Sequence, residues 1–163
     1  MKHPLLFPLC VAAGLVAAQS AAQAQTAVQS FNVTATVQKS CIVVTNDLSF
    51  GVYVPTDPAK EASTTLTVTC TNQTPYNVQL NDGLNGTVAN RKMKGGSGSD
   101  TLNYNLYRES ARTNVWGKTN ASDTVAGTGN GSGQVITVYG KIPAAQYVEP
   151  QLYSDTITAT ISF

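Results

Sequence analysis

The chain has 163 residues and carries 10 Lys and Arg, 9 Asp and Glu and a single His, for a net charge of +1. This near-neutral balance argues against nucleic acid or an anionic membrane surface as the main partner. The only histidine, His3, lies in a predicted leader, so the mature chain has no imidazole for general-base catalysis or zinc binding. We therefore expect a non-enzymatic protein with no catalytic residue, no metal ligands and no cofactor.

The first 24 residues have the pattern of a secretory signal peptide. Lys2 and His3 form a short basic start, and residues 5–18 form an apolar run that is too short and too rich in small residues for a permanent bilayer span. Ala22-Gln23-Ala24 matches an A-x-A cleavage site. We predict export with cleavage after Ala24, no stable membrane insertion, and a mature chain of one domain.

Beyond the leader, the chain reads as a series of short strands rather than helices. Thr, Val, Asn, Gly and Tyr dominate, and these residues favour strands and turns. We expect strands near residues 31–37, 41–44, 48–54, 64–70, 76–80, 102–106, 135–139 and 153–163, and a further one beginning at Val115 and Trp116. Strands of this length, separated by turn signals, indicate an all-β antiparallel sandwich.

Two of these segments alternate strictly between apolar and polar residues. One is residues 153–163, where the sequence given ends, and the other is residues 31–37, just after the leader. Such alternation is typical of half-buried strands. A sheet that lacks a neighbour at one strand, in a chain with a spare strand elsewhere, can polymerise head to tail by β-strand addition. The alternative is that the two segments pair within one closed domain.

The mature chain has two cysteines, Cys41 and Cys70. An even pair in an exported chain is most simply one disulfide, because the compartments outside the cytoplasm are oxidising. Closing a loop of about 30 residues stabilises the fold by roughly 3–4 kcal/mol in the chain-entropy model. The alternative, a reactive thiol pair, would be favoured by C-x-x-C spacing or a basic neighbour, which are missing here.

Two further motifs have a functional and a structural interpretation. The glycine-rich stretch Gly127–Gly133 superficially suits a phosphate, but a strand pattern follows it where a nucleotide loop needs a helix, so we expect a mobile hairpin loop. Arg91, Lys92 and Lys94 form a small basic cluster. We interpret this cluster as a solvated loop rather than a glycan or anion site.

Five short motifs follow one another along the mature chain: Leu48-Ser49-Phe50-Gly51, Leu102-Asn103-Tyr104-Asn105-Leu106-Tyr107-Arg108, Asn114-Val115-Trp116-Gly117, Val138-Tyr139-Gly140-Lys141-Ile142-Pro143 and Tyr153-Ser154-Asp155-Thr156-Ile157. In this order they resemble the spore coat protein U domain family, whose best-known members are subunits of archaic, Csu-type chaperone–usher pili. The positions of the two cysteines also fit that family.

The resemblance implies an incomplete immunoglobulin-like antiparallel β-sandwich that is completed by donor-strand complementation. It divides the mature chain into an N-terminal donor-strand extension, residues 25–38, and a pilin domain, residues 39–163. A periplasmic pilus chaperone would fill the groove first, and at an outer-membrane usher the next subunit's extension would replace it. By position, the donor strand would present Phe31, Val33, Ala35 and Val37. The acceptor groove and chaperone-binding edge would consist of Ile157, Ala159, Ile161 and Phe163.

The resulting hypothesis is a structural pilus subunit, secreted through the periplasm to the cell surface, that forms a homo- or heteropolymer and serves surface adhesion and biofilm formation. The terminal carboxylate of Phe163 would be the anchor for basic residues of the chaperone. One alternative is a secreted spore or cell coat protein of the same domain. Another is a soluble carbohydrate-binding module that uses Tyr107 or Trp116.

Overall fold

The computed structural model describes residues 23–96 and 98–163. These residues belong to two units, one reaching to Thr36 and one comprising Val37–Phe163, which we describe separately. The predicted signal peptide lies outside the described residues except for its last two positions. Residues 23–40 contain no strand, so the strand predicted at 31–37 is not formed, and Phe31 and Val33 are 86% and 84% exposed.

The second unit is an all-β domain, as predicted, and no helix occurs in the part of the chain that the structure describes. Its strands alternate between buried and exposed residues, which explains why the period-2 sequence pattern located most of them. The strands are β1 (Cys41–Thr45), β2 (Lys60–Cys70), β3 (Pro75–Leu80), β4 (Arg91–Gly95), β5 (Thr101–Tyr107), β6 (Val125–Thr128), β7 (Gly133–Ile142), β8 (Tyr153–Ser154) and β9 (Ala159–Ser162).

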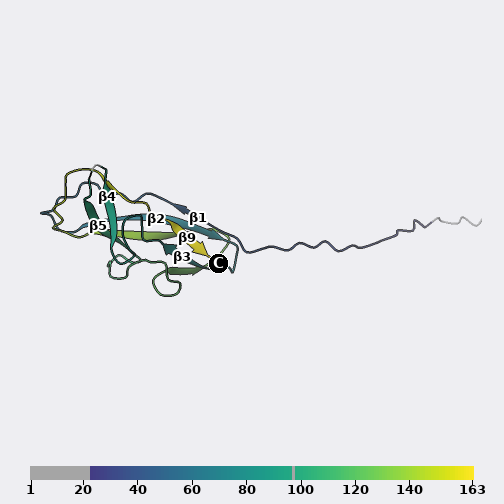
Figure 1. Cartoon of the computed structure of the whole chain (residues 1–163). Helices are drawn as coiled ribbons and strands as arrows, with labels where there is room; N and C mark the ends of the chain where they lie inside the picture. The colour runs from purple at the N-terminus through teal and green to yellow at the C-terminus, as the bar shows by residue number, and fades with distance from the viewer. Residues whose placement is uncertain (1–22, 97) are drawn as a thin grey trace, which may run out of the picture. The chain divides into compact units, whose positions relative to one another are not determined.

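The strands form two antiparallel sheets (Figure 1). The larger sheet has the order β1-β2-β7-β5-β4-β8 and the smaller one β6-β3-β9. The long pairing of β2 with β7, from Lys60 opposite Ile142 to Thr69 opposite Gly133, is the backbone of the larger sheet. The core between the sheets consists of Leu66, Val68, Cys70, Tyr76, Val78, Leu80, Leu102, Tyr104, Leu106, Trp116, Val138 and Ile142.

The C-terminal segment differs from the single strand predicted at 153–163. It forms two short strands in different sheets, because β8 pairs with β4 in the larger sheet whereas β9 pairs with β3 in the smaller one. Residues 155–158 cross from one sheet to the other. The alternation of half-buried and exposed residues nevertheless continues through the crossing without a break. The pattern therefore specified the two faces of the segment but not the change of sheet.

Four other predictions differ from the structure. The basic cluster is not a solvated loop, because Arg91, Lys92 and Lys94 belong to β4 and Arg91 is fully buried. The glycine-rich loop is shorter than the predicted Gly127–Gly133, because β6 extends to Thr128 and β7 begins at Gly133. Residues 48–54 form no strand, and Val115 makes only an isolated bridge with Tyr107.

Candidate functional site

The domain has a cavity between the segment that follows β1 and the segment that precedes β9. Each of these strands is the edge of its sheet, with β1 paired to β2 and β9 paired to β3. The two edge strands lie close together. A cavity of about 460 Å³ lies between the segments next to them, with residues 45–48 on one side and 153–157 on the other. Its floor consists of the core residues Leu66, Leu80, Tyr104, Leu106 and Val138. These floor residues are each at most 6% exposed, so the cavity reaches the edge of the hydrophobic core without exposing it to solvent.

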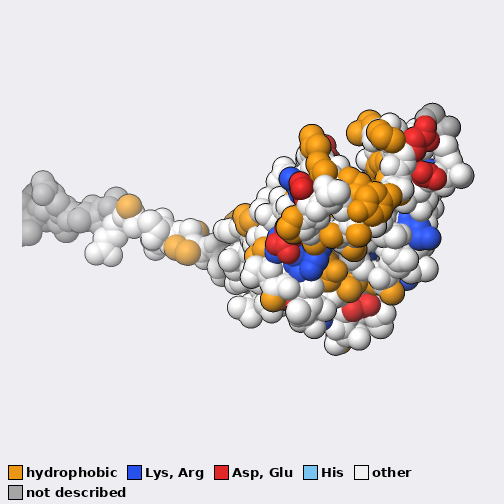
Figure 2. Space-filling view, turned by 90° about the vertical axis from the view of Figure 1, so that its left-hand side faces the viewer, with side chains coloured by type: hydrophobic (Ala, Val, Ile, Leu, Met, Phe, Trp, Pro, Cys, Tyr) orange, Lys and Arg blue, Asp and Glu red, His pale blue; other side chains and the backbone are white. Residues whose placement is uncertain are grey.

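A second cavity, of about 580 Å³, extends the first. The two share Leu48, Phe50, Met93 and Tyr153, and the walls of the second are residues 48–53 and 148–153. Val52 and Leu152 at its rim are 78% and 83% exposed. Figure 2 shows apolar side chains gathered on the end of the domain that these loops form. We call the two cavities together the open groove.

The C-terminal wall of the open groove contains two of the four predicted acceptor residues. Ile157 and Ala159 line the first cavity, and Ile161 packs against the core from the same face of the segment. Phe163 is 54% exposed and lines neither cavity. Of the four predicted residues, the structure therefore places Ile157 and Ala159 in the wall of the first cavity, whereas Ile161 and Phe163 line neither cavity.

One polar group faces into this wall at the crossing between the sheets. The carboxylate of Asp155 accepts a hydrogen bond from the Tyr104 hydroxyl at 2.7 Å and one from the backbone N–H of Leu84 at 2.8 Å. Burial, together with this hydrogen bond, raises the pKa of Tyr104. The phenol therefore stays protonated and remains a donor to Asp155.

Arg91 lies behind the same wall, and sequence reasoning missed its buried position. Its guanidinium donates to the carbonyls of Asn81 at 2.7 Å and Trp116 at 2.7 Å, and to the side-chain oxygen of Asn105 at 2.7 Å. Burial lowers the pKa of Arg91, but these acceptors compensate for lost hydration. A signal was present in the sequence, since Arg91 and Met93 alternate with lysines, but the flanking glycines and polar residues concealed it.

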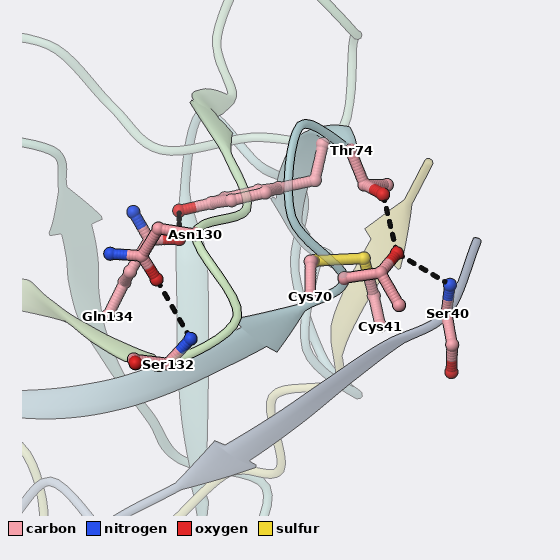
Figure 3. The surroundings of a disulfide bond; sticks show 9 residues. Ser40, Cys41, Cys70, Thr74, Asn130, Ser132 and Gln134 are labelled. Carbon is pink, nitrogen blue, oxygen red and sulfur yellow. Dashed lines mark hydrogen bonds between the residues drawn. A yellow bond between two sulfur atoms is a disulfide. The ribbon is translucent and has the colours of Figure 1, made fainter. Parts of the chain in front are cut away.

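The other end of the domain is closed by the predicted disulfide between Cys41 and Cys70, with an S–S distance of 2.02 Å (Figure 3). This pairing excludes the reactive-thiol alternative. The disulfide joins the first residue of β1 to the last residue of β2, and the backbone N–H of Thr71 donates to the carbonyl of Ser40 at 2.9 Å just before it. The N-terminal wall of the open groove is therefore fixed covalently to the long central strand pair.

The predicted donor residues have the opposite environment. Phe31, Val33 and Val37 are all more than four-fifths exposed, and Ala35 is exposed as well. Their polar neighbours are equally exposed, so no core fixes one face of this segment. A run of alternate apolar side chains in water is normally a surface that a partner covers.

The carbohydrate-binding alternative loses one of its two candidate residues. Trp116 is fully buried and its indole N–H donates to the carbonyl of Val78 at 2.9 Å, so its ring cannot stack on a sugar. Tyr107 is only half-buried.

In the described residues no cluster of His, Cys, Asp and Glu could hold a metal ion, and no helix there is long and apolar enough to cross a membrane.

Comparison with known proteins adds three findings. The model of the Spore Coat Protein U domain family matches residues 27–160. Protein U of Myxococcus xanthus is 32% identical over 93% of both chains. A chain of the CsuC–CsuE chaperone–tip adhesion subunit pre-assembly complex, from the archaic chaperone-usher Csu pili of Acinetobacter baumannii, superposes with a TM-score of 0.60 at 23% identity. That superposition covers 78% of the present chain and 41% of the Csu chain.

Proposed function

Since the chain belongs to the Spore Coat Protein U domain family, we propose that it is a pilus subunit that polymerises by donor-strand exchange. The Spore Coat Protein U domain is a structural, non-enzymatic domain, in agreement with the prediction from the missing imidazole. In the proposed fibre, the extension of one copy, residues 25–38, fills the open groove of the next. The likeness to a Csu pilus chain supports the fold on which this proposal depends.

The observation that carries the proposal is the open groove itself. Leu66, Leu80 and Leu106 border a cavity that a further strand could fill, although each is at most 5% exposed in the isolated chain. Both flanking strands, β1 and β9, also have one unpaired edge among the described residues. An inserted strand would therefore gain backbone hydrogen bonds from an edge and burial of alternate side chains from the floor.

The extension has the length and pattern for such a strand. Phe31, Val33, Ala35 and Val37 lie on one face when the segment is extended, and a strand of seven residues is about 23 Å long. The wall from Tyr153 to Ser162 contains a comparable number of residues. Ile157, Ala159 and Ile161 would be the acceptor residues facing the donor.

A groove flanked by two edge strands needs a temporary occupant before assembly, because unpaired strand edges aggregate. We assign this role to a periplasmic chaperone, with the carboxylate of Phe163 as its anchor, and transfer to the next subunit to an outer-membrane usher. The assembled fibre would lie at the cell surface, where it would serve adhesion and biofilm formation.

A second candidate is a secreted coat protein built from the same domain. The 32% identity to Protein U over nearly the whole chain favours it. The groove and extension would then assemble a coat rather than a usher-built fibre, so the two candidates differ in their need for a usher and not in the strand exchange.

The proposal is tested by deleting residues 25–38 behind an intact signal peptide. We expect the shortened chain to form no denaturation-resistant multimers, and to bind a synthetic peptide of residues 25–38 when this is offered to its chaperone complex. The matched control is a second peptide of the same 14 residues, in which Phe31, Val33, Ala35 and Val37 are replaced by Ser. Multimers of the shortened chain, or equal binding of both peptides, would contradict donor-strand exchange. Multimers that form without a usher would favour the coat protein.

A further inference from the structure

The wall segment at the crossing, residues 155–158, lies against the first cavity without being part of either sheet. A segment of this kind, with few backbone hydrogen bonds, would ordinarily open easily. Any strand that binds beside it would then have to order it first, at a cost in affinity. Two polar contacts from the rest of the domain prevent this.

The first contact is the carboxylate of Asp155. It accepts from the backbone N–H of Leu84 at 2.8 Å and from the Tyr104 hydroxyl at 2.7 Å, which come from two different parts of the domain. Gly83 makes the approach possible, because a Cβ there would lie 2.0 Å from the Asp155 carboxylate oxygen. Gly83 also has a φ of +78°, which favours glycine.

The second contact continues the ladder between β3 and β9 by one pair beyond Leu80 opposite Ala159. The backbone N–H of Asn81 donates to the carbonyl of Thr158 at 3.1 Å, as in a regular ladder. The return bond is unusual, since the N–H of Thr158 donates to the side-chain oxygen of Asn81 at 2.9 Å. The Asn81 side chain replaces its own carbonyl as the acceptor.

Arg91 is the reason for this replacement. Its guanidinium donates to the Asn81 carbonyl from two nitrogens, at 2.9 and 2.7 Å. No carboxylate among the described residues lies within ion-pair distance of it. A buried cation held only by carbonyl and amide oxygens is weak evidence for a stabilising role, because desolvation opposes it. The position of Arg91 instead fixes residues 81–84, from which both contacts to the wall segment extend.

We propose that Asp155, Asn81 and Arg91 are positioning residues of the open groove. They hold residues 155–158 extended, with the side toward the cavity free, so that an incoming strand meets a preformed edge. This inference rests on the proposed donor-strand exchange and adds the residues that set its rate. A preformed edge lowers the ordering cost of binding, so it speeds capture of the strand and slows its release.

The test uses the subunit in complex with its chaperone and a fluorescent peptide of residues 25–38. The variants are Asp155→Ala, Asp155→Asn and Gly83→Ala. The third should displace the Asp155 carboxylate without removing any hydrogen-bonding group. Thr74→Ala is the matched control. Thr74 is buried at the disulfide end of the domain, and the substitution removes the 2.6 Å hydrogen bond between its hydroxyl and that of Thr71. Peptide capture, peptide release and the thermal midpoint are measured for each variant.

We expect Asp155→Ala and Gly83→Ala to capture the peptide about tenfold more slowly and release it about tenfold faster, as the loss of one or two hydrogen bonds implies. Asp155→Asn, which retains an oxygen acceptor for Leu84, should restore most of both rates. Thr74→Ala should lower the thermal midpoint and leave both rates unchanged. If Asp155→Ala and Thr74→Ala change the rates equally, Asp155 has no positioning role and the inference is wrong. If the unaltered protein captures no peptide, the proposed function fails and this inference fails with it.

Discussion

Two segments of this chain have the same alternation of apolar and polar residues and opposite structural environments. Residues 31–37 are exposed on both faces and form no strand. Residues 153–161 alternate between half-buried and exposed, and residues 153–157 form a wall of the open groove. Period-2 alternation therefore specifies which side chains share a face, but a partner decides whether the face is covered. In the proposed fibre, each segment is the partner of the other in a neighbouring copy.

The largest effect that tests this comparison comes from a charge on the wall. Ile157→Asp places a carboxylate in the first cavity, where an unpaired charge costs several kcal/mol once a strand covers it. We expect loss of both the chaperone complex and the multimers, measured by co-purification and by gel electrophoresis without heating. Thr160→Asp, on the exposed face of β9, is the control and should retain both. Equal behaviour of the two variants would show that the wall does not bind a strand through this face.

Loss of the disulfide should have the next largest effect. Replacing Cys41 and Cys70 by Ala releases a loop that contains β1, the N-terminal wall of the groove and β2. We expect the free energy of unfolding of the peptide-complemented domain to fall by about 3–4 kcal/mol, as measured by urea titration. The peptide should also dissociate faster, because one wall is no longer fixed. An unchanged unfolding curve would contradict the structural role of the disulfide.

The smallest effect concerns a turn that belongs to neither segment and so serves as a reference. Hydrogen bonds from the backbone N–H of Asn114, and from Thr113, hold the pKa of Glu109 at about 2. Because the pKa of Glu109 is lowered in the folded state, the stability that its carboxylate contributes is fully present at pH values above the usual pKa of a glutamate. This stability is lost as the pH falls toward 2. Carboxyl chemical shifts should therefore titrate near pH 2, with little change in multimer stability between pH 7 and 5. A midpoint above 4 would show that these hydrogen bonds are absent in solution.

The fold class was predictable because most strands have one face in the core. On β2, Leu66, Val68 and Cys70 are buried and the residues between them are not, so local alternation and tertiary position agree. The disulfide was predictable because only two cysteines remain after the leader. The acceptor residues Ile157, Ala159 and Ile161 were assigned from a family resemblance, and their role remains a proposal.

The features that were missed depend on contacts between distant parts of the chain. Arg91 is in a core position because carbonyls of Asn81 and Trp116 surround it, and no local pattern encodes such a set of acceptors. The division of the last segment between two sheets likewise depends on Asn81 and Asp155 rather than on its own alternation. Polar groups that determine where a strand ends lie far away in sequence, so periodicity does not reveal them.

The most direct test of donor-strand exchange is a phase test in the extension. Val33 and Thr34 are adjacent, and in an extended segment they point to opposite faces. We predict that Val33→Asp abolishes the ladder of denaturation-resistant multimers while the chaperone complex is retained, because the chaperone would occupy the groove and not the extension. Thr34→Asp should give a normal ladder. A normal ladder from Val33→Asp, or the same result for both variants, would contradict the proposal that this segment is a donor strand in the proposed phase.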